Sequence, residues 1–212
     1  MEVRHRTRKL YTDFNAYIRR NRKRFLIKQD PKVIWLTGLS GAGKTTIAEA
    51  LEKEILRKGY FTKSFDGDIM REGINKDLGY SLEDRKENIR RTAEIAKIFM
   101  EYGSIVICSF ITPTEEIRKI ARNIIGRNNF IEIYVNAPLE VCEKRDPKGL
   151  YKKARNGLLK DFTGLDSEFE PPVQPDIELR TDLWPVKKCV KYMMIYILPQ
   201  IKFRKKGWFR IK

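Results

Sequence analysis

Apolar runs and amphipathic stripes alternate along the middle of the chain. Short apolar runs rich in β-branched residues predict buried strands at 33–37, 60–65, 104–110, 130–135 and 176–180. Between these runs apolar residues recur every three or four positions, which predicts helices at about 47–56, 81–100, 114–125 and 186–197. This alternation predicts an α/β fold in which a parallel sheet is covered by helices on both faces.

One glycine-rich segment, Gly38-Leu39-Ser40-Gly41-Ala42-Gly43-Lys44-Thr45, joins the first predicted strand to the first predicted helix. It matches the pattern G-x-x-x-x-G-K-[ST] in the strand–loop–helix context that this pattern requires, which disfavours a turn that binds nothing. Glycines let the backbone curl until its N–H groups point at phosphate oxygens, and the helix N-terminus adds partial positive charge. We therefore predict an ATP site of the P-loop type, whose phosphate ligands are Gly38, Ser40, Gly41, Gly43, Lys44, Thr45 and Thr46.

Within this site, Lys44 and Thr45 have separate predicted roles. Lys44 would reach the β- and γ-phosphates, and the Thr45 hydroxyl would help to hold Mg²⁺.

Two acids, Asp66 and Asp68, follow the second predicted strand. Ligands of open parallel sheets bind outside the carboxyl ends of the strands, so both carboxylates should face the site. One acid can order Mg²⁺ or its waters, and the other can orient or deprotonate an attacking hydroxyl. Asp-Gly-Asp alone is a weak signal because turns often contain it. Its position one strand after the phosphate loop favours phosphoryl transfer.

The regions that follow supply candidate substrate contacts and a lid. Ser81 with Asp84 resembles a capping box that opens the long helix, and Arg85 and Asn88 lie on its first turns, toward the strand ends. Residues 145–165 are basic and punctuated by glycines, which predicts a mobile lid that closes over bound nucleotide. A plain surface helix is the alternative for this segment.

The net charge of +16 is concentrated at the two ends of the 212-residue chain. Residues 1–30 carry ten Lys/Arg against three Asp/Glu, and residues 183–212 carry nine against none. Residues 31–182 hold 25 of each sign and are neutral. The phosphate-binding body therefore requires no polyanionic partner, and nucleic acid is not its expected ligand. We predict a basic arm at 1–30, a catalytic body at 31–200 and a basic, aromatic tail at 201–212.

The N-terminal arm has apolar residues at helical spacing among its cations, namely Leu10, Phe14, Tyr17 and Ile18. This predicts a short amphipathic helix. It would either dock on its own domain with a solvated basic face or adhere to an anionic surface, such as a membrane, a nucleic acid or a partner enzyme.

Other classes of protein are disfavoured by composition. No apolar run approaches the roughly 20 residues that span a bilayer, and the first thirty residues lack the apolar region of a secretory signal. Cys108, Cys142 and Cys189 have no paired spacing and only His5 as an imidazole partner, so neither a disulfide framework nor a zinc site is indicated. We expect a cytoplasmic location.

Three stretches carry a specific resemblance. They read F-D-G-D-x-x-R-x-G-I-N-K-D-L-G-Y-S-x-E-D-R-x-E-N-I-R-R, F-I-T-P, and R-D-P-K-G-L-Y-K-K-A-R-x-G…D-F-T-G-L-D. Together, over roughly residues 31–182, they closely resemble the adenylylsulfate kinase family. That family transfers the γ-phosphate of ATP to the 3′-hydroxyl of adenosine 5′-phosphosulfate (APS) and so makes PAPS. The resemblance implies ATP and Mg²⁺ as cofactors, APS as the acceptor, and a homodimer.

The resemblance also implies residue roles. Asp68 would be the base or orienting acid beside the acceptor ribose, Asp66 would support the metal, and Lys148 on the lid would approach the transferring phosphate. The implied acceptor contacts are Arg71, Arg85 and Asn88 to the phosphosulfate, Tyr80 and Phe162 around the adenine, and Thr112 in F-I-T-P.

Some positions depart from the family pattern. Ile69 stands where the family usually has Asn, and Glu72 begins a segment that is usually His-Gly-Leu. Tyr80 replaces the usual Phe, and Thr112 the usual Ser. Ile69 and Glu72 leave open a kinase of the same architecture that acts on a different nucleotide-linked acceptor. A second alternative is a binding protein that uses its basic ends while the phosphate loop is vestigial.

Overall fold

A single parallel sheet organises the part of the chain that the structure describes. The structure is a computed structural model and describes residues 23–159 and 161–204. Its strands are paired in the order β2-β3-β1-β4-β5. Their bounds are β1 (Val33–Thr37), β2 (Thr62–Asp66), β3 (Ile105–Ser109), β4 (Phe130–Asn136) and β5 (Ile177–Arg180).

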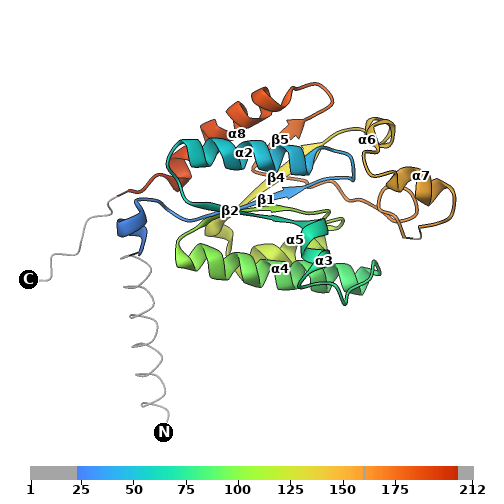
Figure 1. Ribbon diagram of the computed structural model, residues 1–212, viewed down its shortest axis with the longest axis horizontal. Coiled ribbons are helices and arrows are strands. Elements are labelled where there is room, and N and C mark those ends of the chain that lie inside the picture. Colours follow the sequence, from blue (N-terminus) through green and yellow to red (C-terminus); the bar gives the residue numbers. More distant parts are fainter. Residues whose placement is uncertain (1–22, 160, 205–212) are drawn as a thin grey trace, which may run out of the picture.

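Helices cover both faces of this sheet, as the sequence predicts. In Figure 1, α2 and α8 lie on one face, and α4 and α5 lie on the other. The helices are α2 (Lys44–Arg57), α3 (Gly67–Glu72), α4 (Leu82–Tyr102), α5 (Glu115–Ile125), α6 (Leu139–Arg145), α7 (Leu150–Arg155) and α8 (Val186–Ile201), with a 3₁₀ turn, η1 (Arg127–Asn129), before β4. None of these helices is both long and apolar enough to cross a bilayer.

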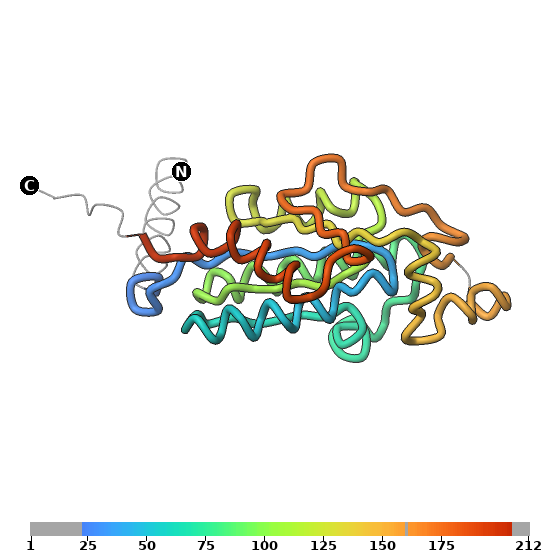
Figure 2. The backbone as a smooth tube through the Cα atoms, turned by 90° about the horizontal axis from the view of Figure 1, so that it is seen from above, coloured from blue at the N-terminus to red at the C-terminus, as the bar shows by residue number. Residues whose placement is uncertain are grey.

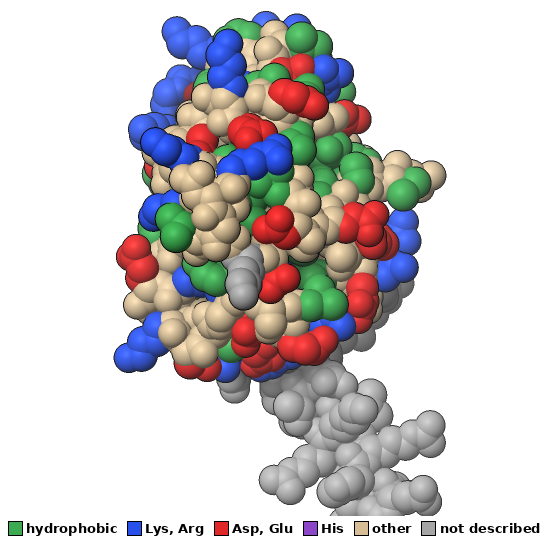
Figure 3. Space-filling view, turned by 90° about the vertical axis from the view of Figure 1, so that its right-hand side faces the viewer, with side chains coloured by type: hydrophobic (Ala, Val, Ile, Leu, Met, Phe, Trp, Pro, Cys, Tyr) green, Lys and Arg blue, Asp and Glu red, His purple; other side chains and the backbone are tan. Residues whose placement is uncertain are grey.

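The two ends of the sheet differ in what surrounds them. The carboxyl ends of the strands point toward α6 and α7, and the amino ends point toward residues 23–30 and the end of α8 (Figures 1 and 2). Figure 3 views the molecule from the α6–α7 end and shows charged side chains of both signs around apolar ones.

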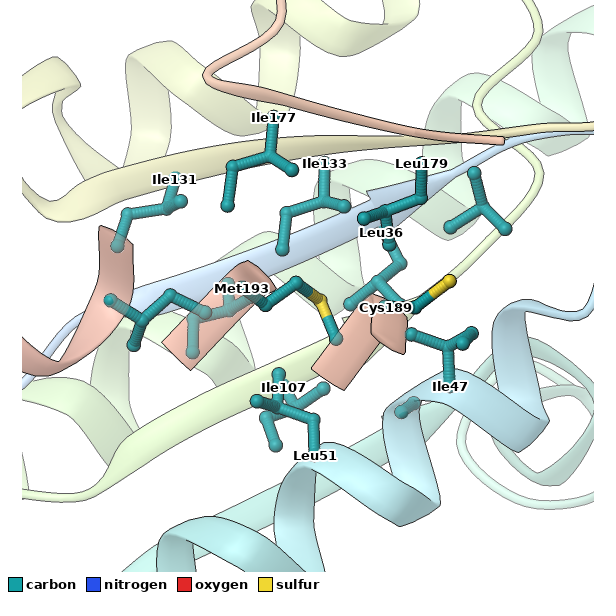
Figure 4. Close-up of a cluster of buried hydrophobic side chains, with 14 of the residues drawn as sticks. Leu36, Ile47, Leu51, Ile107, Ile131, Ile133, Ile177, Leu179, Cys189 and Met193 are labelled. Carbon is teal, nitrogen blue, oxygen red and sulfur yellow. The ribbon is translucent and has the colours of Figure 1, made fainter. Parts of the chain in front are cut away.

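The central strand β1 is buried on both faces, which explains its unbroken apolar sequence. Its side chains alternate between two cores. Ile34 and Leu36 pack into the cluster under α2 and α8 (Figure 4), whereas Val33 and Trp35 pack into the cluster under α4 and α5. The strand order therefore places the loop after β1 at the middle of the carboxyl edge.

The long helix α4 begins and ends where its sequence directs. At its start the Ser81 hydroxyl accepts the Asp84 amide N–H at 3.2 Å, as the capping prediction requires. At its end Gly103 has a φ of 118°, and a Cβ there would lie 2.6 Å from Ile27 Cδ1. The positive φ favours glycine at this position, whereas the end of the Ile27 side chain could move aside.

Several element bounds differ from the sequence prediction. Asp66 is the last residue of β2, and helix α3, which was not predicted, follows directly. It forms because the Asp66 carboxylate accepts the Asp68 N–H at 3.0 Å and caps it. Helix α8 continues through Pro199, since Ile201 beyond it is still buried in the core. The expected amphipathic helix from Leu10 lies outside the described residues.

Candidate active site

A cavity of about 580 Å³ lies at the carboxyl ends of the strands. It brings together residues from segments that lie far apart in the chain. These residues were predicted from the sequence to bind ATP, the metal ion or the acceptor. Those that line it are Ser40, Gly41, Gly43, Lys44, Thr45, Thr46, Asp66, Asp68, Arg71, Tyr80, Arg85, Asn88, Lys148 and Phe162.

The phosphate loop is held by backbone packing on one side and is open on the other. Gly41 has a φ of 74°, and a Cβ there would lie 2.6 Å from the Cys142 carbonyl oxygen. Gly43 also has a positive φ, of 96°, but a Cβ there would meet nothing within 4 Å. Gly43 precedes α2 without any side-chain cap, so the first amide groups of α2 are available to an anion.

Gly38, which is predicted as a phosphate ligand, does not line the cavity, and packing requires a glycine at this position. A Cβ at Gly38 would lie 2.3 Å from the carbonyl oxygen of Val135 in β4. Because the first glycine of the motif has no Cβ, the chain can leave β1 in close contact with the backbone of β4.

Lys44 is folded back on its own loop. Its Nζ donates to the Leu39 carbonyl at 2.9 Å. Burial lowers the pKa of the Lys44 ammonium to about 8, against the opposing attraction of the Asp66 carboxylate. Bound phosphate oxygens would favour the charged form again, because an opposite charge at close range raises the pKa of an ammonium.

The two predicted acids are linked to the phosphate loop and to residues 145–165. The Thr45 hydroxyl donates to Asp66 Oδ2 at 2.8 Å. Asp68 forms an ion pair with Lys148, which joins α3 to the segment between α6 and α7. Both of these side chains are more than half exposed, so the pair contributes little to stability and can exchange partners.

Two arginines form a second wall of the cavity. Arg71 donates to the carbonyls of Leu78 and Gly79, at 3.2 and 2.6 Å, and its guanidinium lies 4.6 Å from the Tyr80 ring centroid. Arg85 donates to the Tyr80 carbonyl at 2.8 Å.

Arg85 also fastens the segment after α7 to α4. It donates to the Thr163 hydroxyl at 2.8 Å and to the Asp161 carbonyl at 2.7 Å. Burial and the nearby Arg71 charge lower the pKa of Arg85. Two like charges held close together in this way favour an anion between them.

The remaining predicted acceptor contacts lie on the same side. Asn88 is buried, and its side-chain amide lies 2.7 Å from Asn75 Nδ2; with the amide oriented so that its oxygen faces Arg71, that oxygen accepts from Arg71 Nη2 at 3.0 Å. Tyr80 is 60% exposed at the cavity edge. Phe162 packs edge-on against Tyr151, with ring centroids 4.9 Å apart, and the Tyr151 hydroxyl donates to the Ser40 carbonyl at 3.0 Å. Residues 151–162 are thus connected to the phosphate loop.

Thr112 does not line the cavity, although the family resemblance implies an acceptor contact for it. It is fully buried, and its hydroxyl accepts from Trp35 Nε1 at 3.1 Å and bonds to the Thr37 hydroxyl at 2.9 Å. Its carbonyl accepts from the buried Arg118 at 3.1 Å. The hydroxyl therefore ties the ends of β1 and β3 together.

A group of residues on the far side of the phosphate loop was not predicted to belong to the site. Arg145 donates to the carbonyls of Gly41 and Thr181, at 3.2 and 2.7 Å. The Thr181 hydroxyl donates to the Ala42 carbonyl at 2.7 Å, and Trp184 also lines the cavity. Thr181 directly follows β5, so the rule that ligands bind beyond the strand ends could have identified it.

The two positions that raised the question of another acceptor lie outside the cavity. Ile69 is 68% exposed and Glu72 is also exposed, and neither lines the cavity. The Glu72 carboxylate therefore adds no negative charge to the cavity lining.

The donor set fits Mg²⁺ held together with a nucleotide. No cluster of three acidic, Cys or His side chains suited to a metal is found among residues 23–159 and 161–204. A Mg²⁺ ion needs few protein ligands when phosphates and waters complete its shell. The Thr45 hydroxyl and the Asp66 carboxylate are hard oxygen donors beside the phosphate loop, as such an ion requires.

Comparison with known proteins identifies the family. The sequence profile of the family described as Adenylylsulphate kinase matches residues 30–180. The chain belongs to this family. An adenylyl-sulfate kinase of Clostridium acetobutylicum is 50% identical over 180 residues, which is 85% of this chain and 90% of that relative. An adenylyl-sulfate kinase of Bacillus licheniformis is 51% identical over 170 residues, or 80% of this chain and 86% of that relative.

A solved structure agrees with this assignment. The adenylylsulphate kinase CysC of Mycobacterium tuberculosis, in complex with AMPPNP and APS, is 38% identical and superposes with a TM-score of 0.77. The match covers 80% of this chain and 98% of that one. The family resemblance of the three sequence stretches and the predicted P-loop fold are therefore confirmed.

Proposed function

We propose that this chain transfers the γ-phosphate of ATP to the 3′-hydroxyl of APS, giving PAPS and ADP. One observation supports this most directly. The phosphate loop, the wall formed by Arg71, Arg85 and Tyr80, and the carboxylates of Asp66 and Asp68 all line the same cavity. A phosphate donor and an anionic, aromatic acceptor can therefore be held in one enclosure, as a reaction between two nucleotides requires.

On the donor side, backbone amides of the loop and the N-terminus of α2 would hold the ATP phosphates. Lys44 would turn from the Leu39 carbonyl to the β- and γ-phosphates. Thr45 and Asp66 would hold Mg²⁺. When bound, this ion would neutralise part of the negative charge of the phosphates.

On the acceptor side, Arg71, Arg85 and Asn88 would hold the phosphosulfate, and Tyr80 and Phe162 would enclose the adenine. Asp68 would orient the 3′-hydroxyl and accept its proton as the oxygen attacks the γ-phosphorus. A new P–O bond forms to the ribose, the bond to the β-phosphate oxygen breaks, and ADP leaves.

We further propose that residues 145–165 act as the lid of a catalytic body spanning 31–200. Lys148 forms an ion pair with Asp68, and that pair is exposed enough to be broken easily. Phosphate oxygens would draw the Lys148 ammonium away, which frees Asp68 for the acceptor hydroxyl and places a cation beside the transferring group.

A coupled assay of ADP release tests the function. Purified full-length chain is given Mg²⁺ and ATP with APS or with a panel of unsulfated nucleotides. We expect turnover with APS and little with the others. Faster turnover with another nucleotide would establish the kinase of different acceptor specificity, and no turnover with any acceptor would favour the binding-protein alternative.

A homodimer and a cytoplasmic location stay part of the proposal. The described helices do not span a bilayer, and the three free cysteines are buried, which suits a reducing compartment. Light scattering of the purified chain tests for the dimer, and a monomer mass would refute it.

A further inference from the structure

The segments leading to the two basic ends of the chain meet at one place. Gln29 and Lys202 form an antiparallel bridge, and the Asp30 amide donates to the Ile201 carbonyl at 2.7 Å. The rings of Phe25 and Phe203 contact edge to face, with centroids 6.1 Å apart. Residues 23–30 and 199–204 therefore lie side by side, as Figures 1 and 2 also show. We call these two segments the basal pole.

The basal pole is rigidly fixed to the amino ends of the strands. Gln29 is fully buried, and its amide nitrogen donates to the carbonyls of Phe61 and Gly103, each at 2.8 Å. Its amide oxygen accepts from the Phe61 N–H at 2.8 Å. Phe61 immediately precedes β2, and Gly103 ends α4. The active-site cavity lies at the opposite ends of the same strands.

Most of the net charge of the protein is attached to this pole. Residues 1–28 carry ten Lys/Arg against two acids, and residues 202–212 carry six against none. These 39 residues thus account for fourteen of the sixteen net positive charges. The α6–α7 end instead shows both signs of charge (Figure 3). The described residues of the pole themselves carry five Lys/Arg against one Asp, and such a cluster of cations orients the molecule in the field of an anionic surface.

The pole also exposes apolar side chains among its cations. Leu26 is 77% exposed and Phe25 is 50% exposed, beside the exposed Lys28 and Lys202. Lys23 lies over the Tyr102 ring, 4.5 Å from its centroid, and Tyr102 is itself 63% exposed. The same mixture continues in the tail sequence, where Trp208, Phe209 and Ile211 alternate with Arg and Lys.

We propose that the basal pole docks on an anionic lipid bilayer. Phosphate groups of a nucleic acid would satisfy the cations but would give an aliphatic side chain such as Leu26 no apolar environment. A bilayer surface suits the cations and the apolar side chains alike. Lipid phosphates attract the cations, and apolar and aromatic side chains insert at the boundary between headgroups and acyl chains. This orientation leaves the active-site cavity facing away from the membrane and open to solvent.

Sedimentation of the full-length chain with vesicles tests the proposal. The vesicles contain phosphatidylcholine alone or phosphatidylcholine mixed with phosphatidylglycerol, each at low and high salt. We expect binding to the anionic vesicles, weakened by salt, and little binding to the neutral ones. Equal binding to both compositions, or binding to neither, would overturn the proposal.

Two variants locate the contact. Each lost cation should weaken binding about fivefold, so Lys28→Gln with Lys202→Gln should weaken it at least tenfold. Leu26→Gln should weaken it several-fold without changing the charge.

The matched control is Lys53→Gln with Lys119→Gln, which removes two exposed lysines from α2 and α5. An equal loss in the control would mean non-specific charge attraction and would refute a docking face.

The kinase rate in solution and the melting temperature of each variant show whether it is correctly folded. We expect both quantities to stay at the wild-type level. Duplex DNA and RNA serve as competing probes. Binding to either that is tighter than to anionic vesicles, and indifferent to Leu26→Gln, would assign the pole to nucleic acid instead.

Discussion

The two halves of the active-site cavity are built in different ways. The phosphate half is formed mainly by one contiguous segment, the loop at residues 40–46, and the backbone beneath this loop is packed so closely that a Cβ at Gly41, or at Gly38 just before it, would clash with a carbonyl oxygen. The acceptor half is assembled from α3, α4 and the proposed lid, residues 145–165, and its side chains reach partners up to 80 residues away along the chain.

This difference predicts different sensitivities. The phosphate half is preorganised by backbone packing, so a change to one of its side chains should remove a contact without moving the rest. The acceptor half depends on arginine side chains for its shape. Arg85 bonds to three separate carbonyl or hydroxyl groups, and its removal should loosen the wall as well as remove a charge.

Replacement of the loop lysine should have the largest effect. Lys44→Ala removes the cation that is placed to meet the β- and γ-phosphates, and we expect a loss of about 10³-fold or more in kcat with the melting temperature little changed. Steady-state kinetics and thermal unfolding measure both quantities. An undiminished rate would show that the phosphate half is not the donor site.

Loss of Arg85 should act mainly on the acceptor. Arg85→Ala should raise the KM for APS by about 10- to 100-fold, since a hydrogen bond to a charged group contributes about 1.5–3 kcal/mol. Arg85→Lys should recover little, because an ammonium cannot reproduce the forked contacts. The control is Arg90→Ala, on the same helix, which breaks only a surface pair with Glu87. If both variants changed the KM equally, Arg85 would have no special role.

Tyr80 should contribute less than Arg85. Tyr80→Ala should raise the KM for APS about tenfold and leave the KM for ATP nearly unchanged, because base stacking on an aromatic ring is worth about 1–3 kcal/mol. Tyr80→Phe should retain most of the affinity. Equal losses for both substrates would indicate that the ring supports the fold and does not contact the acceptor.

The smallest effect is expected at Glu72. Its carboxylate is exposed and outside the cavity lining, so Glu72→Gln should change either KM by no more than about twofold. A large fall in the KM for APS would instead mean that the carboxylate repels the acceptor, and the acceptor half would then include residues of α3 beyond Arg71.

The phosphate half and the β1–α2 core that carries it could be predicted from sequence because both rest on local rules. A buried strand, a glycine-rich loop and an amphipathic helix each need only a short window of residues. The acceptor half was assigned by family resemblance, and the structure placed all of its predicted residues in the cavity except Thr112.

Other features of the protein depend on contacts between segments that are distant in the sequence, and only the tertiary structure shows them. The sequence around Thr112 gives no sign that its hydroxyl is used by Trp35 and Thr37, because that pairing exists only when β1 and β3 lie side by side. Arg145 and Thr181 become neighbours of the phosphate loop for the same reason. The sequence located the positive charge at the two ends of the chain, but the contacts of Gln29 and Lys202 brought the segments that lead to these ends together at one pole, because residues so far apart in the sequence meet only in the folded domain.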